Sequence, residues 1–227
     1  VMLLDAAKGV ESQTRKLFRV CRQRSIPIFT FVNKMDRPGR DPFELIGEVE
    51  SVLGIGVVPL TWPVFRSGLF LGVYHRTLDK LMLFDESRAG SSATQGAMVV
   101  PMNVGDLDDP RLRAQIGQDG CEQLEQDIDL LNAAGDAFDP SSFLQGRLSP
   151  MFFGSAINNF GLETFLDSFI QMMPPPGPRA SSIGLVDPGR QEFTGFVFKV
   201  QANMNPAHRD RVAFVRICSG QFHRKTK

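Results

Sequence analysis

Apolar residues at the start of the chain follow a strand–helix–strand pattern. Residues 1–4 form a short apolar run that ends at Asp5, and a second apolar run covers residues 27–32. Between them, one helix face is predicted up to about residue 24 from four residues at helical spacing: Val10, Thr14, Leu17 and Cys21. Two strands joined by one helix predict a right-handed crossover and therefore a parallel sheet.

A second helix is predicted to begin at Asp41. Asp41 and Pro42 are typical of a helix start, because Asp accepts bonds from the first N–H groups and Pro fits the first turn. The apolar face predicted for this helix consists of Leu45, Ile46, Val49, Val52 and Leu53. Gly54 ends the helix, and residues 57–64 are predicted to form one short strand.

The pattern changes over residues 65–149, which predict an inserted α+β subdomain. Its predicted elements are strands near residues 69–75, 81–85 and 98–101, a polar loop at 87–96, a helical stripe of Cys121, Leu124, Ile128 and Leu131, and a short helix over residues 140–144. Trp62, Tyr74 and His75 lie on the predicted strands. Packing in the sheet is a simpler interpretation of these side chains than contact with a partner.

The last part of the chain returns to a strand–helix pattern and then becomes β-rich. Residues 150–153 predict a strand, and a helix follows from about Gly161 with Leu162, Phe165, Leu166, Phe169, Ile170 and Met173. The proline-rich segment 174–178 stops this helix and predicts a stiff linker. Alternating residues over 193–200 and an apolar run over 212–218 then predict two strands that open a β-barrel domain.

Composition excludes several classes of protein. Lys plus Arg and Asp plus Glu are 25 each, so the net charge is zero, and we expect no DNA partner and only local patches for RNA. The three cysteines are far apart and form no C-x-x-C pair, so neither a disulfide framework nor a zinc site is expected. No apolar run approaches the ~20 residues of a membrane span. We expect a cytoplasmic protein.

The most informative motif follows the second predicted strand. Asn33-Lys34-Met-Asp36 matches the Asn-Lys-x-Asp motif with which GTP-binding proteins recognise guanine. A carboxylate on Asp36 can accept from both N1–H and the N2 amino group of guanine, whereas adenine would leave it unpaired. Asn33 can bond the base edge or tie loops together, and Lys34 can lay its stem along the base. An ordinary surface turn is the alternative interpretation of these four residues.

A second loop strengthens the guanine interpretation. The predicted strand at 150–153 runs into Gly154-Ser155-Ala156, and a helix follows. In GTPases such a turn closes over guanine, and the backbone N–H of the Ala donates to O6. Ser155 is expected to brace the Asp36 loop by a hydrogen bond. An ordinary strand-to-helix turn explains this loop alone, but two such loops in this order favour guanine binding.

Several longer segments resemble the bacterial release factor 3 family of translational GTPases. They are Asp5-Ala-Ala-Lys-Gly-Val10, Asn33-Lys-Met-Asp36, Thr61-Trp-Pro63, Gly72-Val-Tyr-His75, Phe152-Phe-Gly-Ser-Ala156 and the barrel segment from Phe193 to Phe214. The barrel segment is the most particular to this family. The resemblance covers the whole chain and implies a ribosome-dependent GTPase that removes class I release factors after peptide release.

The resemblance also defines the expected fold and its boundaries. It implies an α/β fold, with a partial P-loop GTPase-type parallel sheet, an inserted α+β subdomain and the start of an all-β barrel. The expected parts are residues 1–64 and 150–175 of the G domain, 65–149 as the insertion, 176–192 as a linker and 193–227 as the start of barrel domain II. We expect the chain to be an internal fragment of a longer protein.

The chain departs from the GTPase pattern in the parts that hold phosphates. It contains no G-x-x-x-x-G-K-[ST] loop, so it lacks the backbone cradle and the Mg²⁺-binding hydroxyl of that motif. The resemblance implies GTP or GDP with Mg²⁺ in the full-length protein, whose Mg²⁺ ligands are expected outside this chain. We therefore expect the chain alone to be inactive as a GTPase, with no catalytic residue of its own.

Two other functions stay open at this point. An elongation factor G-like translocase or a ribosomal protection GTPase would also have an insertion between the two loops and a following barrel. The segments 61–75 and 193–214 argue against both. A module of another class, which binds guanine nucleotides as a scaffold and never hydrolyses GTP, would lack a phosphate loop in the whole protein.

Overall fold

A computed structural model shows two compact units, residues 1–173 and 174–227. The structure describes residues 1–84, 97–100, 110–134, 137–202 and 211–224. The polar loop predicted at 87–96 lies outside these ranges. Each unit is treated by itself below.

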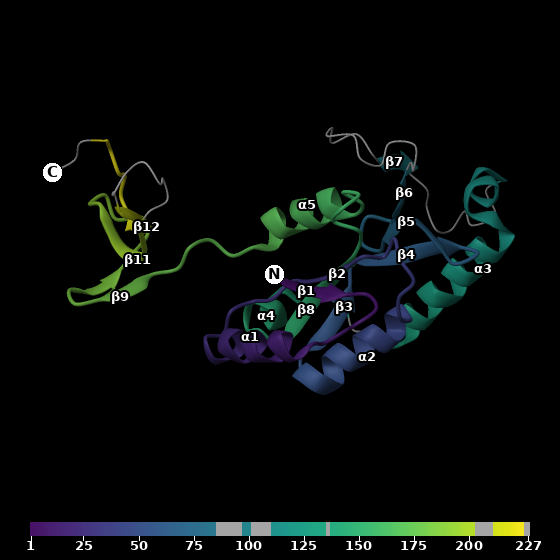
Figure 1. The fold of residues 1–227 in the computed structure, drawn as a ribbon, viewed down its shortest axis with the longest axis horizontal. Coiled ribbons are helices and arrows are strands. Elements are labelled where there is room, and N and C mark those ends of the chain that lie inside the picture. Colours follow the sequence, from purple (N-terminus) through teal and green to yellow (C-terminus); the bar gives the residue numbers. More distant parts are fainter. Residues whose placement is uncertain (85–96, 101–109, 135–136, 203–210, 225–227) are drawn as a thin grey trace. The chain divides into compact units, whose positions relative to one another are not determined.

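The first unit contains a parallel sheet with strand order β1-β2-β8-β3 (Figure 1). Its strands are β1 (Met2–Asp5), β2 (Thr30–Asn33), β8 (Leu148–Phe153) and β3 (Gly56–Pro59), and its helices are α1 (Ser12–Gln23), α2 (Pro42–Leu53), α4 (Pro140–Leu144) and α5 (Leu162–Met172). All three strand pairings are parallel, which confirms the predicted α/β fold.

A second, antiparallel sheet of order β4-β5-β6-β7 follows in the same unit. Its elements are β4 (Thr61–Arg66), β5 (Leu69–His75), β6 (Lys80–Phe84), β7 (Ala97–Val100) and α3 (Pro110–Ala134), which has a non-helical Gly117 inside it. The side chain of Trp62 is 1% exposed, and its indole N–H donates to Asp127 of α3 over 2.8 Å. Trp62, Tyr74 and His75 are therefore core residues, as predicted.

The single strand predicted over residues 57–64 is wrong. The chain instead forms β3 and β4, which belong to different sheets and are separated only by Leu60. The continuous apolar run gives no sign of this switch, because both strands are buried. A hydrogen bond joins the two sheets where they meet: the N–H of Phe153 in β8 donates to the Thr61 hydroxyl over 3.1 Å.

The apolar face predicted for α1 is also partly wrong. Phe18 is the side chain buried beneath this helix, whereas Leu17 is 57% exposed. Thr14 and Cys21 are half-buried, as their place beside Phe18 on the helix requires. The predicted buried face lies too close to Leu17. The apolar residue types alone do not show which side of the helix packs on the sheet.

The start and end of α2 agree with the prediction in detail. The Asp41 carboxylate accepts from the backbone N–H groups of Phe43 and Glu44, and Pro42 occupies the first turn. Gly54 adopts a left-handed conformation with φ of 66° after the last turn, where residues with a Cβ are disfavoured. The caps fix the length of the helix that follows the Asp36 loop.

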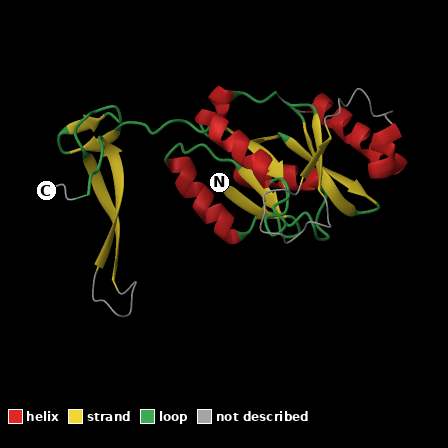
Figure 2. Cartoon of the chain, turned by 90° about the horizontal axis from the view of Figure 1, so that it is seen from above, coloured by secondary structure: helices red, strands yellow, loops and turns green. Residues whose placement is uncertain are grey.

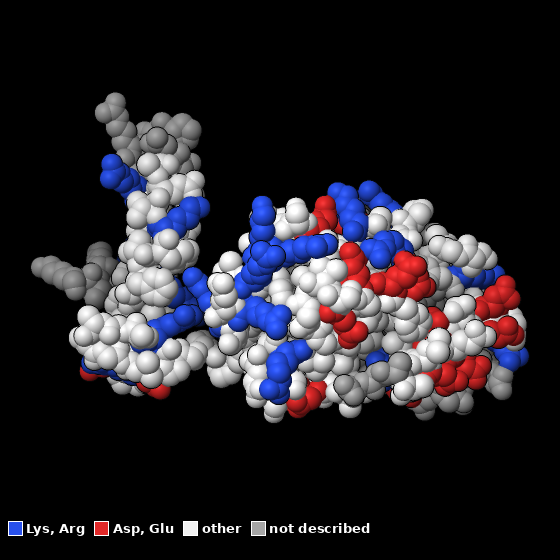
Figure 3. Space-filling view, turned by 90° about the horizontal axis from the view of Figure 1, so that it is seen from below, with Lys and Arg blue, Asp and Glu red and all other residues white. Residues whose placement is uncertain are grey.

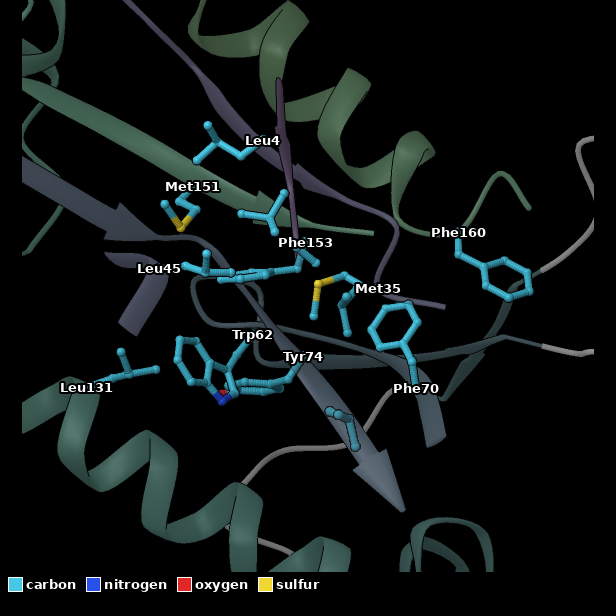
Figure 4. Packing of buried hydrophobic residues seen from close by; sticks show 14 of the residues in the cluster. Leu4, Met35, Leu45, Trp62, Phe70, Tyr74, Leu131, Met151, Phe153 and Phe160 are labelled. Carbon is cyan, nitrogen blue, oxygen red and sulfur yellow. The ribbon is translucent and has the colours of Figure 1, made fainter. Parts of the chain in front are cut away.

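The two sheets of the first unit share one hydrophobic core. Trp62 of β4 lies with its ring centroid 4.6 Å from that of Phe43 in α2 and 5.6 Å from that of Phe153 in β8. Figure 4 shows Trp62 beside Tyr74 within this cluster. A second cluster on the parallel sheet includes Phe143 of α4. Residues 65–149, predicted as an insertion, also join the shared core, because Phe84 of β6 stacks on Phe160 with ring centroids 4.3 Å apart.

The predicted apolar face of α5 is only partly buried. Phe165 is 6% exposed, but Leu166, Ile170 and Met173 are 50%, 72% and 50% exposed. The buried side of α5 meets Phe29 and Phe152 of the sheet. Phe169 packs against the same cluster, with its ring centroid 4.9 Å from that of Phe29, so Leu166 and Ile170 are the apolar side chains of α5 left exposed.

The second unit consists of two pairs of antiparallel strands. They are β9 (Arg179–Ser181) with β10 (Gly184–Val186), and β11 (Thr194–Ala202) with β12 (Arg211–Ser219). Figure 2 draws both pairs as strands. The range 176–192 was predicted as a linker but includes the β9–β10 hairpin. Its turn is closed by the Ser181 hydroxyl, which donates to the carbonyl of Gly184 over 2.8 Å.

We predict that Gly72→Ala destabilises the first unit. A Cβ at residue 72 would collide with the backbone oxygen of Met82 in the neighbouring strand, so β5 and β6 would have to separate. We expect a loss of about 1–3 kcal/mol in the free energy of unfolding, measured by urea denaturation.

Gly47→Ala is the matched control for this substitution. Gly47 is exposed in the interior of α2, and a Cβ there meets nothing within 4 Å. We expect a gain of about 0.5–1 kcal/mol, because Ala favours the helix. Equal midpoints for the two variants would contradict the close approach of β5 and β6.

Candidate functional site

Three neighbouring parallel strands bring their carboxyl ends to one edge of the sheet. β1 ends at Asp5, β2 ends at Asn33, and β8 leads into Gly154-Ser155-Ala156. Phe31 pairs with Phe152 in the register of β2 and β8, so the two loops leave the sheet at the same level. The carboxyl edge of a parallel α/β sheet is where such folds bind ligands.

The side chain of Asn33 joins the two loops that the sequence singled out. Its Oδ1 accepts from the N–H of Lys34 over 2.8 Å and from the N–H of Ala156 over 2.9 Å. A backbone bond runs parallel to this one, from the N–H of Met35 to the carbonyl of Gly154 over 3.1 Å. The structure thus brings together Asn33 and Ala156, which are 123 positions apart in the sequence.

The Ser155–Ala156 turn depends on a close approach of backbone to backbone. Ser155 and Phe160 exchange two N–H···O bonds of 2.9 Å, which fold the turn back on itself. A Cβ on Gly154 would collide with the backbone oxygen of Phe160, so only glycine fits. The Ser155 hydroxyl accepts from Asn158 over 3.2 Å. The brace expected between Ser155 and the Asp36 loop is made instead by the Met35–Gly154 backbone bond.

Lys34 is fixed at both its backbone and its ammonium group. Its backbone is left-handed, with φ of 69°, and its Nζ donates to the Asp5 carboxylate over 2.7 Å. The N–H groups of Ala7 and Lys8 donate to the other oxygen of Asp5. The bond from Lys34 lowers the pKa of the Asp5 carboxyl most, and the backbone bonds add to this against the opposing effect of burial. The Lys34 stem is thereby held along the carboxyl edge.

Sequence reasoning missed Asp5 as part of this site. The segment around Asp5 was noted only as a strand end and as part of a family resemblance. The position of Asp5 in the sequence could have revealed its role. Asp5 follows a strand predicted to pair in parallel with the strand that precedes Asn33. Carboxyl ends of paired parallel strands lie side by side, so a carboxylate there can reach Lys34.

The Asp36 carboxylate has one oxygen without a donor. Its Oδ1 is buried and lacks a hydrogen-bond partner among the described residues, and its Oδ2 lies 3.7 Å from Nε of Arg37. The side chain as a whole is 21% exposed. A buried carboxylate oxygen without a donor is unfavourable by about 1–3 kcal/mol or more, so this group fits a ligand that brings N–H donors to it.

The residues that the structure describes include no cluster of three or more His, Cys, Asp or Glu side chains that could hold a metal ion. Across the same residues, no helix is long and apolar enough to cross a membrane.

Comparison with known sequences identifies the family. The sequence model of the elongation factor Tu GTP binding domain matches residues 1–175. The chain belongs to this family. The model of elongation factor G domain 2 matches residues 192–227, which contain β11 and β12. The family binds guanine nucleotides, in agreement with the two loops at the carboxyl edge.

Similar proteins carry a more particular name. Peptide chain release factor 3 of Gloeobacter violaceus is 50% identical over 223 residues, covering 98% of this chain and 41% of that protein. Peptide chain release factor 3 of Symbiobacterium thermophilum is 51% identical over 224 residues, covering 99% and 41%. These matches confirm the resemblance to the release factor 3 family. The chain spans about two fifths of the length of these relatives.

A solved structure supports the fold. A crystal structure of a protein from Thermus thermophilus matches with a TM-score of 0.62 at 18% identity, covering 96% of this chain and 31% of that chain. At this identity the likeness concerns the fold alone.

We predict that Asn33→Ala loosens the two loops. The substitution removes the oxygen that accepts from Lys34 and Ala156, so both N–H groups lose their partner. The expected loss is about 1–2 kcal/mol in the free energy of unfolding, measured by urea denaturation. Asn33→Asp retains an accepting oxygen and should lose less. A larger loss for Asn33→Asp than for Asn33→Ala would contradict the bridging role of Oδ1.

Proposed function

We propose that this chain is part of a cytoplasmic, ribosome-dependent GTPase that promotes dissociation of class I release factors after peptide release. Guanine recognition is assigned to Asn33, Lys34, Asp36, Ser155 and Ala156. The observation that carries the assignment is the Asp36 Oδ1, a buried acceptor without a donor among the described residues, beside two loops joined through Asn33. About 50% identity to proteins named peptide chain release factor 3 supports the choice within the family.

Each assigned residue has a separate task in this proposal. The Asp36 carboxylate accepts from N1–H and N2 of guanine, which gives its Oδ1 the missing donor. Lys34, held by Asp5, lays its stem along the base. The N–H of Ala156 donates to Asn33 Oδ1 over 2.9 Å, so a guanine O6 would share or replace that bond. Ser155 shapes the turn through its bonds with Phe160.

Hydrolysis is assigned to parts of the full-length protein outside this chain. The chain has no G-x-x-x-x-G-K-[ST] motif, so the contacts described here reach the base and leave the phosphates unbound. In this proposal the nucleotide's Mg²⁺ is held outside the described site. The ribosome and a ribosome-bound class I release factor are the macromolecular partners.

We predict that Asp36→Asn in the full-length protein changes the preferred base. The amide offers one acceptor and one donor, so guanine loses a bond while xanthine, with its C2 carbonyl, gains one. Affinity for GDP should fall by at least about two orders of magnitude, and XDP should bind more tightly than GDP. Competition with a fluorescent nucleotide measures both constants, and an unchanged GDP affinity would refute the role of Asp36.

We predict that residues 1–227 alone neither hydrolyse GTP nor bind GDP tightly. Base contacts without phosphate contacts leave the charged part of the nucleotide in water, so we expect a Kd of about 1 mM or weaker. Isothermal titration with GDP tests the affinity, and release of labelled phosphate tests hydrolysis. A micromolar GDP complex with this chain would show that it contains a phosphate site of its own.

The function itself is tested on ribosomes. Full-length protein and GTP are mixed with post-termination ribosomes that hold a fluorescent class I release factor, and loss of the label is followed. GTP-dependent acceleration of label loss is the expected result. Ribosome-stimulated hydrolysis without acceleration would instead favour a translocase or a ribosomal protection GTPase. Absence of both activities would favour a nucleotide-binding scaffold.

A further inference from the structure

The segment around α1 separates positive charge from negative charge along the chain. From Ser12 to Met35 the sequence contains no Asp or Glu, although the whole chain has equal numbers of acidic and basic residues. The basic residues of this segment before β2 are Arg15, Lys16, Arg19, Arg22 and Arg24. The neutral net charge therefore hides a local cationic surface.

The cations on the exposed side of α1 lack acidic partners. Arg15, Lys16 and Arg19 are exposed, and their side chains make no ion pair or hydrogen bond among the residues that the structure describes. Two other exposed cations do pair with carboxylates, Lys8 with Glu11 at 3.7 Å and Arg190 with Glu192 at 2.6 Å. The three cationic side chains on α1 are thus free to bind an anionic group of another molecule.

The packing of α1 fixes the direction in which these charges point. Phe18 is 5% exposed and anchors the helix on the sheet. The end of the Arg22 side chain is held, because its guanidinium donates to the carbonyl of Leu53 over 3.2 Å. Arg15 and Arg19 are one turn apart on the same side of the helix as Arg22. Figure 3 shows Lys and Arg side chains gathered on the part of the molecule where Figure 1 places α1.

We propose that the exposed side of α1, defined by Arg15, Lys16 and Arg19, binds the phosphodiester backbone of RNA. Arg15 and Arg19 are one helical turn apart, about 6 Å along the helix axis, so their side chains can contact separate phosphates of one strand. Arg is suited to phosphate because its donors form a planar fork. Contacts of this kind position a protein on RNA without reading sequence.

The choice of RNA as the source of phosphate rests on the proposed function. A factor that acts on the ribosome works against a surface rich in RNA. An acidic protein is the competing occupant, and it would use the exposed apolar residues Leu17 and Val20, which lie beside the cations on α1. RNA makes a quantitative prediction, because each phosphate contact releases counterions and contributes a fixed amount to the slope of log K against log salt.

The test uses the full-length protein and a short fluorescent single-stranded RNA of mixed sequence. Binding is measured by anisotropy over a range of KCl concentrations for the parent and for Arg15→Gln/Arg19→Gln. The control is Arg147→Gln/Arg190→Gln, which removes two exposed cations whose guanidinium groups donate to Ser142 and Glu192. Affinity for GDP is measured on all three proteins, because none of the four residues belongs to the guanine site.

We expect the α1 variant to bind RNA at least about tenfold more weakly at low salt. The slope of log K against log salt should become less steep by about 1.4, or 0.7 for each phosphate of a single strand that is no longer neutralised. The control should keep the parent slope, and GDP affinity should stay constant throughout.

Three results would overturn the proposal: no RNA binding by the parent, an unchanged slope for the α1 variant, or equal losses in the variant and the control. The first two would leave an acidic protein as the occupant to be tested. Failure of the proposed function would give a different result. GTP would then not accelerate label loss on ribosomes, while the salt slopes of the parent and the α1 variant would still differ.

Discussion

The parallel pairing of β2 with β8 is the constraint on which the candidate site depends. It places the Asn33 loop and the Ser155 loop at one edge of the sheet, although Asn33 and Ala156 are 123 positions apart in the sequence. Asn33 Oδ1 then holds the loops together by accepting from Ala156, and Gly154 permits the close approach that this bond needs. A guanine base bound here would meet a surface that is already assembled in the protein.

The second sheet supports this edge because it shares a core with the parallel sheet. Trp62 packs against Phe43 after the Asp36 loop and against Phe153 before the Ser155 loop. Thr61 accepts from the N–H of Phe153 at the seam between the sheets. Both loops are therefore supported from the side of the second sheet. The Asp36 Oδ1 can remain without a donor from the described residues only because the surrounding structure holds it in place.

Local features of the fold were predictable from the sequence, and features that depend on distant contacts were not. Asp41 and Gly54 bounded α2 correctly, because caps act through neighbouring backbone groups. The change of sheet at Leu60 and the burial of Phe18 were missed, since both are decided by which surface lies opposite. In the site, the motif residues were chosen from their chemistry, whereas the bond from Lys34 to Asp5 emerged only from strand order.

In the proposed function, Asp36 recognises guanine at the carboxyl edge of the parallel sheet. A crystal structure of the full-length protein with GDP would show whether it does. We expect both Asp36 oxygens within about 3.2 Å of N1 and N2 of the base, with Asn33 and Ala156 still in contact across the two loops. A base bound elsewhere, or an Asp36 Oδ1 that still lacks a donor in the complex, would refute this role of Asp36.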